Sequence, residues 1–375
     1  MSTATQTDPE IPAAEEVGPI VSPTRLMWWK FKAHRLALVS GIFLLFAYFV
    51  TATAGFWAPY STSERSRYIF APPQMVRIID AEGNLRAPFV YGYDAKRDLE
   101  TLRPVYAKDT SRIYPIKLFV RGSDYKLLGL IRTDIHLFGT AEGGHIFLAG
   151  TDALGRDMFS RLIYGAQISL SVGLIAVLIS LVLGLVIGGI SGLYGGWIDS
   201  ITQRVIEAII AIPTIPLWLG LAAAVPRDWD PVYQYFAILV VLSLISWTST
   251  ARVARGRFLA LRDQDFVTAA RVYGCSQGRI IRKHLIPNIM SYVIVTLTLA
   301  IPNVIIGETA LSFLGVGLRA PTVSWGVLLQ EAQKIQVITF YPWLWIGPAI
   351  CVIVLVLAFN FVGDGARDAA DPFSN

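Results

Sequence analysis

Long apolar stretches dominate this chain and alternate with short polar and charged segments. A membrane-spanning helix needs about 20 predominantly apolar residues to cross about 30 Å of hydrocarbon. The stretches that meet this requirement lie at residues 36–58, 168–190, 204–225, 235–251, 289–312 and 343–362. The fourth is the weakest, because Ser243, Ser246, Thr248 and Ser249 dilute it. The pattern predicts an all-α membrane protein built as a six-helix transmembrane bundle.

Small and helix-bending residues within these stretches predict how the helices pack. Gly184, Gly188, Gly192 and Gly196 recur every four residues and would give the second helix a smooth face for a close neighbour. Kinks are expected where prolines interrupt the later helices, at Pro213, Pro216, Pro302 and Pro348. A bundle of rigid helices and a translocation pathway would both accommodate such kinks.

Two carboxylates, Glu207 and Glu308, fall inside the predicted helices. An intramembrane carboxylate suggests a functional group by default. A proton relay would need a buried Lys, Arg or His partner in the helices, and the sequence suggests none. A structural role for both carboxylates near the helix ends is therefore favoured. Energy for any transport would then come from outside this chain.

Residues 59–150 interrupt the apolar pattern after the first helix. Extended runs surround Glu82-Gly83-Asn84, and a second pair surrounds Gly122-Ser123-Asp124, which predicts two hairpins. We therefore expect a β-containing extracytoplasmic insert. It would either shield the bundle as a spacer or present a docking surface for a substrate-delivering protein, and hairpin patterning does not distinguish these roles.

Composition and charge agree with a membrane location. Hydrophobic residues make up 54% of the chain and charged residues only 16%, against about 25% charged in soluble proteins. The net charge of +5 comes from short blocks beside the helices, so a nucleic-acid-binding face is not expected.

The placement of Lys and Arg predicts the orientation of the bundle. The segment before the first helix carries Arg25, Lys30, Lys32 and Arg35, and the loop 251–288 carries eight Lys and Arg against two Asp. Since basic loops stay in the cytoplasm, both termini and this loop are expected there. Residues 1–35 would form a cytoplasmic tail, disordered over 1–24. Ala52-Thr53-Ala54 resembles a signal-peptide cleavage site, but the apolar run is too long for one, so an uncleaved helix is expected.

Residues that would indicate enzyme chemistry are missing from the sequence. The four His have no metal-ligand spacing, and Cys275 and Cys351 would lie in different environments. No G-x-x-x-x-G-K-[ST] segment occurs, so the chain is not expected to bind nucleotide phosphates. A membrane-embedded enzyme is therefore disfavoured.

The loop DFVTAARVYGCSQGRIIRKHLIPN, residues 265–288, carries the most specific local signals. Asp263 or Asp265 could cap a short helix, Gly274 could end it, and Ser276 could cap a second one. Ala269 and Ala270 would leave a small-residue face that another protein could approach closely. The alternative is an ordinary basic cytoplasmic loop.

This order of residues resembles the coupling loop of ABC importer permeases, in which Glu-Ala-Ala, three residues and Gly precede Ile-x-Leu-Pro. Thr268 stands here where the family has Glu, and His284 where it has Ile, so a salt bridge through that Glu is not expected. The resemblance implies that the ATPase-coupling residues are Asp265, Phe266, Thr268, Ala269, Ala270, Arg271, Gly274 and Pro287.

Three further segments resemble the dipeptide/oligopeptide branch of these permeases: residues 150–170, 307–326 and 363–372. In the first, we expect Arg156, Asp157 and Arg161 to form an external interfacial collar, with Tyr164 at the lipid boundary. In the second, Trp325 would lie in an interfacial loop or re-entrant segment.

The resemblance implies a permease subunit of an ATP-driven importer with the ABC type I fold, in a bacterial inner membrane. Its domains would be the tail 1–35, the first helix 36–58, the insert 59–150 and the permease domain 151–375. Implied partners are a homologous second permease chain, two P-loop ATPase subunits that hold ATP and Mg²⁺, and an extracytoplasmic substrate-binding protein. This chain would hold no cofactor. The solutes would be di- or oligopeptides, or oligosaccharides and related molecules. The alternative is an ATP-independent channel or a scaffold that presents the insert.

Overall fold

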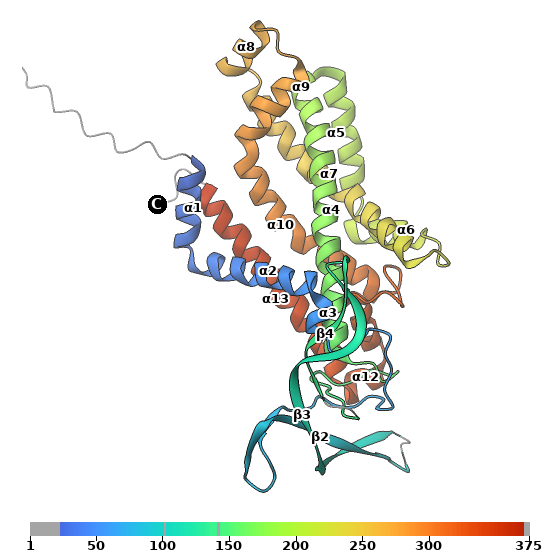
Figure 1. Ribbon diagram of the computed structural model, residues 1–375. Helices are drawn as coiled ribbons and strands as arrows, with labels where there is room; N and C mark the ends of the chain where they lie inside the picture. The colour runs from blue at the N-terminus through green and yellow to red at the C-terminus, as the bar shows by residue number, and fades with distance from the viewer. Residues whose placement is uncertain (1–22, 101–102, 141–142, 371–375) are drawn as a thin grey trace, which may run out of the picture.

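The computed structural model describes residues 23–100, 103–140 and 143–370, and shows a helical bundle with a β-sheet at one end (Figure 1). Residues 1–22 of the predicted disordered tail lie outside the described residues, whereas Pro23 and Thr24 already belong to a helix. The elements are α1 (Pro23–Ala33), α2 (Arg35–Ala52), α3 (Ala54–Trp57), β1 (Arg77–Ile79), β2 (Leu85–Arg97), β3 (Pro104–Leu127), β4 (Ile131–Thr140), α4 (Met158–Tyr194), α5 (Gly196–Ile210), α6 (Thr214–Ala223), α7 (Pro231–Leu261), α8 (Asp265–Val272), α9 (Gln277–Ile280), η1 (Ile281–Leu285), α10 (Ile286–Phe313), α11 (Trp325–Gln330), η2 (Glu331–Gln333), α12 (Ile335–Phe340) and α13 (Trp343–Ala370).

Within the described residues, five helices are long and apolar enough to cross a membrane: α2, α4, α7, α10 and α13. The third predicted stretch, 204–225, is broken where a kink was expected: α5 and α6 meet at a bend of 86°. Pro213 explains the bend. It lacks an N–H for helical bonding, and its ring disfavours the helical conformation at Ile212. The bundle has six spans if the bent pair counts as one.

The other predicted helices occur, but with different ends. α4 has 37 residues and α7 has 31, so at about 1.5 Å per residue both exceed the hydrocarbon thickness. Each therefore carries a polar end beyond the apolar stretch that predicted it. The first helix stops earlier than expected, at Ala52, and a separate turn, α3, follows Thr53.

The predicted glycine face of α4 is the surface against which α7 packs. A Cβ built on Gly188 would lie 2.3 Å from the carbonyl oxygen of Ala251, and one on Gly192 would lie 2.9 Å from that of Arg255. Gly184 is equally close to Thr250. Gly196 does not belong to this face, because it starts α5 with φ +58° and nothing lies within 4 Å of its Cβ position.

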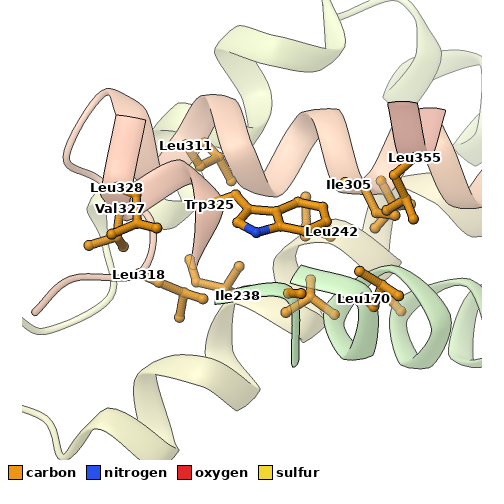
Figure 2. Packing of buried hydrophobic residues seen from close by; sticks show 14 of the residues in the cluster. Leu170, Ile238, Leu242, Ile305, Leu311, Leu318, Trp325, Val327, Leu328 and Leu355 are labelled. Carbon is orange, nitrogen blue, oxygen red and sulfur yellow. The ribbon is translucent and has the colours of Figure 1, made fainter. Parts of the chain in front are cut away.

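The main apolar core joins α4, α7, α10, α11 and α13 (Figure 2). Trp325 lies inside it at 5% exposure, and its indole N–H donates to the carbonyl oxygen of Leu162 at 3.0 Å. The segment 307–326 ends α10, forms a loop over 314–324 and folds back into the bundle at the start of α11, so the Trp325 ring packs against neighbouring helices.

Residues 77–140 form a four-stranded antiparallel sheet in the order β1-β2-β3-β4. The first hairpin turns at 80–84, where the Asp80 carboxylate accepts from the N–H groups of Glu82 (3.1 Å) and Asn84 (2.7 Å). The second predicted turn, at Gly122-Ser123-Asp124, is wrong: β3 continues through it with a shift in register, and the chain turns at 128–130.

Gly122 serves a different purpose from the expected turn. A Cβ there would lie 2.7 Å from the ring of His136 on β4, so the glycine makes room for this imidazole. The His136 Nδ1 in turn lies 2.8 Å from the Gly55 carbonyl oxygen and 2.6 Å from that of Ala58. This contact fastens the sheet to α3, at the end of the first membrane helix.

Candidate functional site

The loop singled out in the sequence forms α8, α9 and η1 at the end of the bundle opposite the sheet (Figure 1). It connects the long helices α7 and α10. As predicted, Gly274 ends α8: it has φ +75°, its N–H donates to the Arg271 carbonyl at 2.9 Å, and the Cys275 N–H donates to that of Ala270 at 3.0 Å. These two bonds form a Schellman motif, which favours glycine at this position.

Neither predicted Asp caps α8, whereas Ser276 does take the N-cap position of α9. The N-cap of α8 is Gln264, which makes no side-chain cap bond. Asp265 is instead the first helical residue, where its charge favours the positive end of the helix dipole. Asp263 pairs with Arg262 at 3.1 Å. Ser276 precedes α9 in the extended conformation of an N-cap, again without a side-chain bond.

α8 has an inward and an outward face. Val267 and Ala270 point inward, at 0% and 7% exposure, into a second apolar core with Phe258 of α7. The core continues into Ile280, Leu285, Ile289 and Val293, the last two on α10. α8 thus shares an apolar core with the ends of both long helices.

The outward face of α8 is exposed and mixes apolar side chains with polar ones, Asp265 among them. Phe266, Val272 and Tyr273 are 39%, 81% and 87% exposed, and the small Ala269 lies between them. The predicted small pair is therefore divided, because Ala269 faces outward while Ala270 packs on its own bundle. Thr268 and Arg271 are also exposed.

Pro287 lies apart from α8, in the first turn of α10, where its missing N–H is not needed by the helix. It is exposed at the same end of the bundle.

A cavity of about 350 Å³ opens within the bundle, lined by α4, α5, α6, α7 and α10. Its lining is mainly apolar, with polar groups from Ser246, Ser249, Thr250, Tyr292, Thr296 and Asn303. None of the described residues that line it is charged. Of these polar groups, the sequence signalled only those of Ser246 and Ser249, as polar residues that weakened the fourth apolar stretch, and a weak span is not by itself evidence of a cavity.

Glu308 and Glu207 take structural positions. Glu308 is completely buried beside the core and accepts from the hydroxyls of Ser169, Ser312 and Ser324 at 3.2, 2.8 and 2.8 Å. Glu207 is exposed and pairs with Arg204 of the same helix at 3.1 Å.

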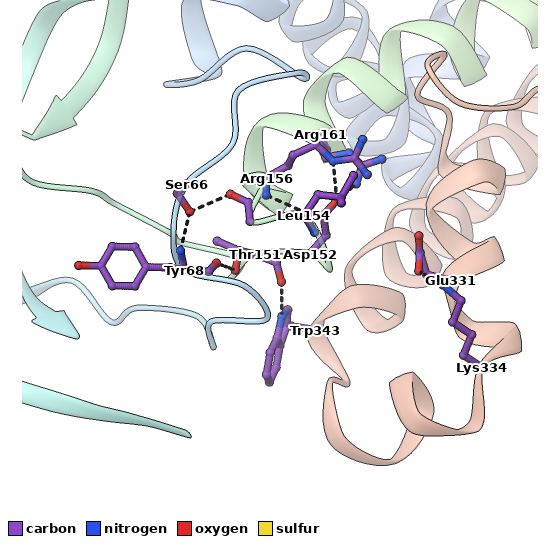
Figure 3. Close-up of polar contacts among 11 residues, drawn as sticks. Ser66, Tyr68, Thr151, Asp152, Leu154, Arg156, Arg161, Glu331, Lys334 and Trp343 are labelled. Atoms are coloured by element: carbon purple, nitrogen blue, oxygen red, sulfur yellow. Dashed lines mark hydrogen bonds and ion pairs between the residues drawn. The ribbon is translucent and has the colours of Figure 1, made fainter. Parts of the chain in front are cut away.

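Residues 150–161 connect the sheet side to the bundle, but not as an exposed collar (Figure 3). Arg161 is only 4% exposed and pairs with Asp152, whose Oδ2 also lies 2.7 Å from Arg156 Nε. The prediction of an external collar is wrong, because Arg156 and Arg161 both form ion pairs with the buried Asp152, a residue that the prediction did not include. Tyr164 is half-buried on α4.

Asp157 is also buried, at 3% exposure, and caps α4 by accepting from the Ser160 N–H at 2.7 Å. Burial raises the pKa of this carboxyl to about 7. The neighbouring Thr151 links three parts of the chain: its hydroxyl donates to the Tyr68 carbonyl at 2.5 Å, and its own carbonyl accepts from the Trp343 indole at 3.2 Å.

Comparison with known proteins places this architecture in a family. Residues 180–374 match the family described as the binding-protein-dependent transport system inner membrane component. The chain belongs to this family. Residues 22–73 also match the N-terminal transmembrane domain of oligopeptide transport permease C. The chain is thus a multi-pass inner-membrane component of a transport system.

Curated bacterial proteins resemble the chain over most of their own length. It is 37% identical to the oligopeptide transport system permease protein OppC of Bacillus subtilis over 223 residues, 60% of this chain and 70% of that one. It is 40% identical to the dipeptide transport system permease protein DppC of the same organism, over 60% and 68%. It is 39% identical to OppC of Escherichia coli, over 62% and 73%.

Among solved structures, the chain resembles an inward-facing conformation of the MetNI methionine ABC transporter. The TM-score is 0.44 at 16% identity, and the similarity covers 56% of this chain and 97% of that one.

Proposed function

We propose that this chain is the permease subunit of an ATP-driven type I ABC importer that carries di- or oligopeptides, as the names of its relatives suggest. Within that family, the observation that carries the proposal is the outward face of α8: Phe266, Val272 and Tyr273 are exposed on or directly after a short helix that shares an apolar core with the ends of two long helices. A surface of this kind is typical of an interface that a partner covers.

The charge distribution supports the orientation of the proposed importer. The loop between α7 and α10 carries the basic residues that favour the cytoplasm. α8 would then face the cytoplasm, and the sheet of residues 77–140 would face the outside. Both termini would be cytoplasmic. Two separate P-loop ATPases would hold ATP and Mg²⁺, since this sequence contains no P-loop.

The packing of α8 suggests how partner motion would reach the transport pathway. An ATPase that grips Phe266 and Tyr273 would move α8, and the buried Val267 and Ala270 would transmit this motion to α7 and α10. Both of these helices line the 350 Å³ cavity. Displacing them would open the cavity alternately to either side, which is the alternating-access step of an importer.

The cavity lining suits a peptide without selecting its side chains. Hydroxyl and amide groups such as Ser249, Thr296 and Asn303 can bind peptide N–H and C=O groups. No charged side chain is among the described lining residues, whereas Arg257 and Arg367 line an adjoining cavity that shares Ser249, Thr296 and Asn303 with it. Specificity would then depend on the extracytoplasmic binding protein, with a homologous second permease chain completing the pathway.

The test is to purify the chain from its native membrane in mild detergent, identify its partners by mass spectrometry and assay ATP hydrolysis. We expect two P-loop ATPases, a second permease and nucleotide hydrolysis. Recovery of this chain alone, without hydrolysis, would instead support the channel or scaffold hypothesis, which family membership does not favour.

A further inference from the structure

The hairpin formed by β3 and β4 ends in an unusually apolar turn. We refer to residues 126–132 as the hairpin tip. Within it, Leu128, Leu130 and Ile131 are 59%, 84% and 61% exposed. Farther from the tip on β3, Leu118 and Phe119 are 67% and 65% exposed. A cluster of large exposed apolar side chains at a loop tip is costly in water and usually marks a contact surface.

The backbone of the hairpin tip satisfies part of its own hydrogen bonding. The Gly129 N–H donates to the Lys126 carbonyl at 3.2 Å, and the Leu130 N–H donates to that of Leu127 at 3.0 Å. Polar backbone groups must be paired wherever water is scarce. A tight turn of this kind can therefore enter the interfacial layer of a bilayer, although not its hydrocarbon centre.

Two cations flank the apolar turn. Lys126 and Arg132 lie directly opposite each other in the β3–β4 pairing, and neither forms an ion pair with any residue that the structure describes. Like charges that face each other across two strands are destabilising. Lipid phosphate groups would relieve this repulsion and bind both side chains.

The base of the hairpin is fixed beside a membrane helix. His136 contacts the carbonyl groups of α3, and the Phe119 ring lies 6.2 Å from that of Phe56. α3 directly continues α2, whose Phe46 and Phe49 are exposed. The turn of the hairpin points back toward the helices, whereas the β1–β2 hairpin points away from them (Figure 1). The apolar tip thus extends the apolar surface of the first span.

We propose that the hairpin tip inserts into the lipid headgroup layer on the sheet side of the membrane, with its leucines in contact with acyl chains and Lys126 and Arg132 bound to phosphates. Continuity with the α2 surface and the opposed cations favour lipid over a protein partner. The insert would then be anchored at two points, α3 and the bilayer. This proposal is independent of the transported solute.

The test uses a fluorescent probe on the full chain, with the subunits that it retains. Cys275→Ser and Cys351→Ala remove both native thiols, and Leu130→Cys introduces one for labelling with NBD. The labelled protein is placed in nanodiscs of phosphatidylcholine and phosphatidylglycerol that contain doxyl-labelled lipid. Leu85→Cys is the matched control, because Leu85 is 79% exposed and lies on the β1–β2 hairpin.

We expect blue-shifted emission and several-fold quenching by the doxyl lipid at position 130, and neither effect at position 85. Adding Lys126→Glu and Arg132→Glu should reduce the quenching at 130. Water-like, unquenched emission at 130 would overturn the proposal. So would blue-shifted emission that the doxyl lipid does not quench, because a protein would then cover the tip.

Discussion

The adjacent alanines of α8 occupy opposite environments. Ala270 is 7% exposed in the second apolar core, whereas Ala269 lies on the outward face. The sequence predicted the pair but not its division, because α8 is short and carries apolar side chains on both faces, so its sequence does not indicate which face its own bundle covers. Gly274, by contrast, was predictable from local chemistry alone, since the end of a helix depends on the conformation of one residue.

The division predicts different effects of the same substitution at these two positions. Ala270→Leu adds volume to a packed core and should lower the free energy of unfolding by about 1–3 kcal/mol. Ala269→Leu should change it by no more than about 0.5 kcal/mol, since the site is exposed. Thermal unfolding in detergent measures both. Equal destabilisation would contradict the assignment of the two faces.

Asp157 predicts a pH dependence of stability. Its folded-state pKa, about 7, lies above the ordinary value of 3.8 because of burial. The folded protein therefore holds this proton more tightly than the unfolded chain. Stability should decline as pH rises from about 4 to 7, by at most about 1.4 kcal/mol per pH unit.

Asp157→Asn keeps an acceptor for the Ser160 N–H but does not titrate. Its advantage over the wild type in thermal unfolding should grow between pH 5 and pH 7. A difference between the two proteins that stays constant over this range would show that Asp157 titrates normally.

Among the elements, the pairing of α4 with α7 depends on close backbone approach. Gly188→Ala would place a Cβ 2.3 Å from the Ala251 carbonyl oxygen and 2.9 Å from its Cα. The helices would have to separate, and we expect a loss of about 1–3 kcal/mol of unfolding free energy.

Gly220→Ala on α6 is the matched control, because nothing lies within 4 Å of its Cβ position. It should leave stability unchanged or raise it by up to about 1 kcal/mol, as alanine favours helix. Thermal unfolding in detergent compares the two variants. A Gly188→Ala protein as stable as the control would exclude the close approach.

Elements were predictable where their cause is local. Apolar length alone located the long helices, and the Asp80–Asn84 turn follows from its own polar side chains. The turn assigned to Gly122 failed because that glycine accommodates His136, which is 14 positions away in the sequence. Likewise, nothing in the sequence indicated that Arg161 is buried. Its ion pair with Asp152 forms only because residues 150–161 fold back on themselves.

At the scale of the whole molecule, one chain of contacts joins α8 to the cavity. The second apolar core links α8 to α7 and α10, and these two helices supply much of the cavity lining. The lining was not predictable from sequence, because it arises only where five packed helices face one another. In the proposed importer, this connection converts ATPase movement into a change of access.

The most direct test of this account is ATP-driven peptide uptake, measured together with ATP hydrolysis, by the purified assembly in proteoliposomes. Ala269→Trp would obstruct the outward face of α8 without entering its core. It should abolish uptake while the chain remains folded and the ATPases still hydrolyse ATP. Gly278→Ala is the control: nothing lies within 4 Å of its Cβ position, so this variant should transport normally. Thr202→Trp would not serve as a control, because the Thr202 hydroxyl forms a hydrogen bond within α5. Full ATP-driven uptake by Ala269→Trp would contradict the account.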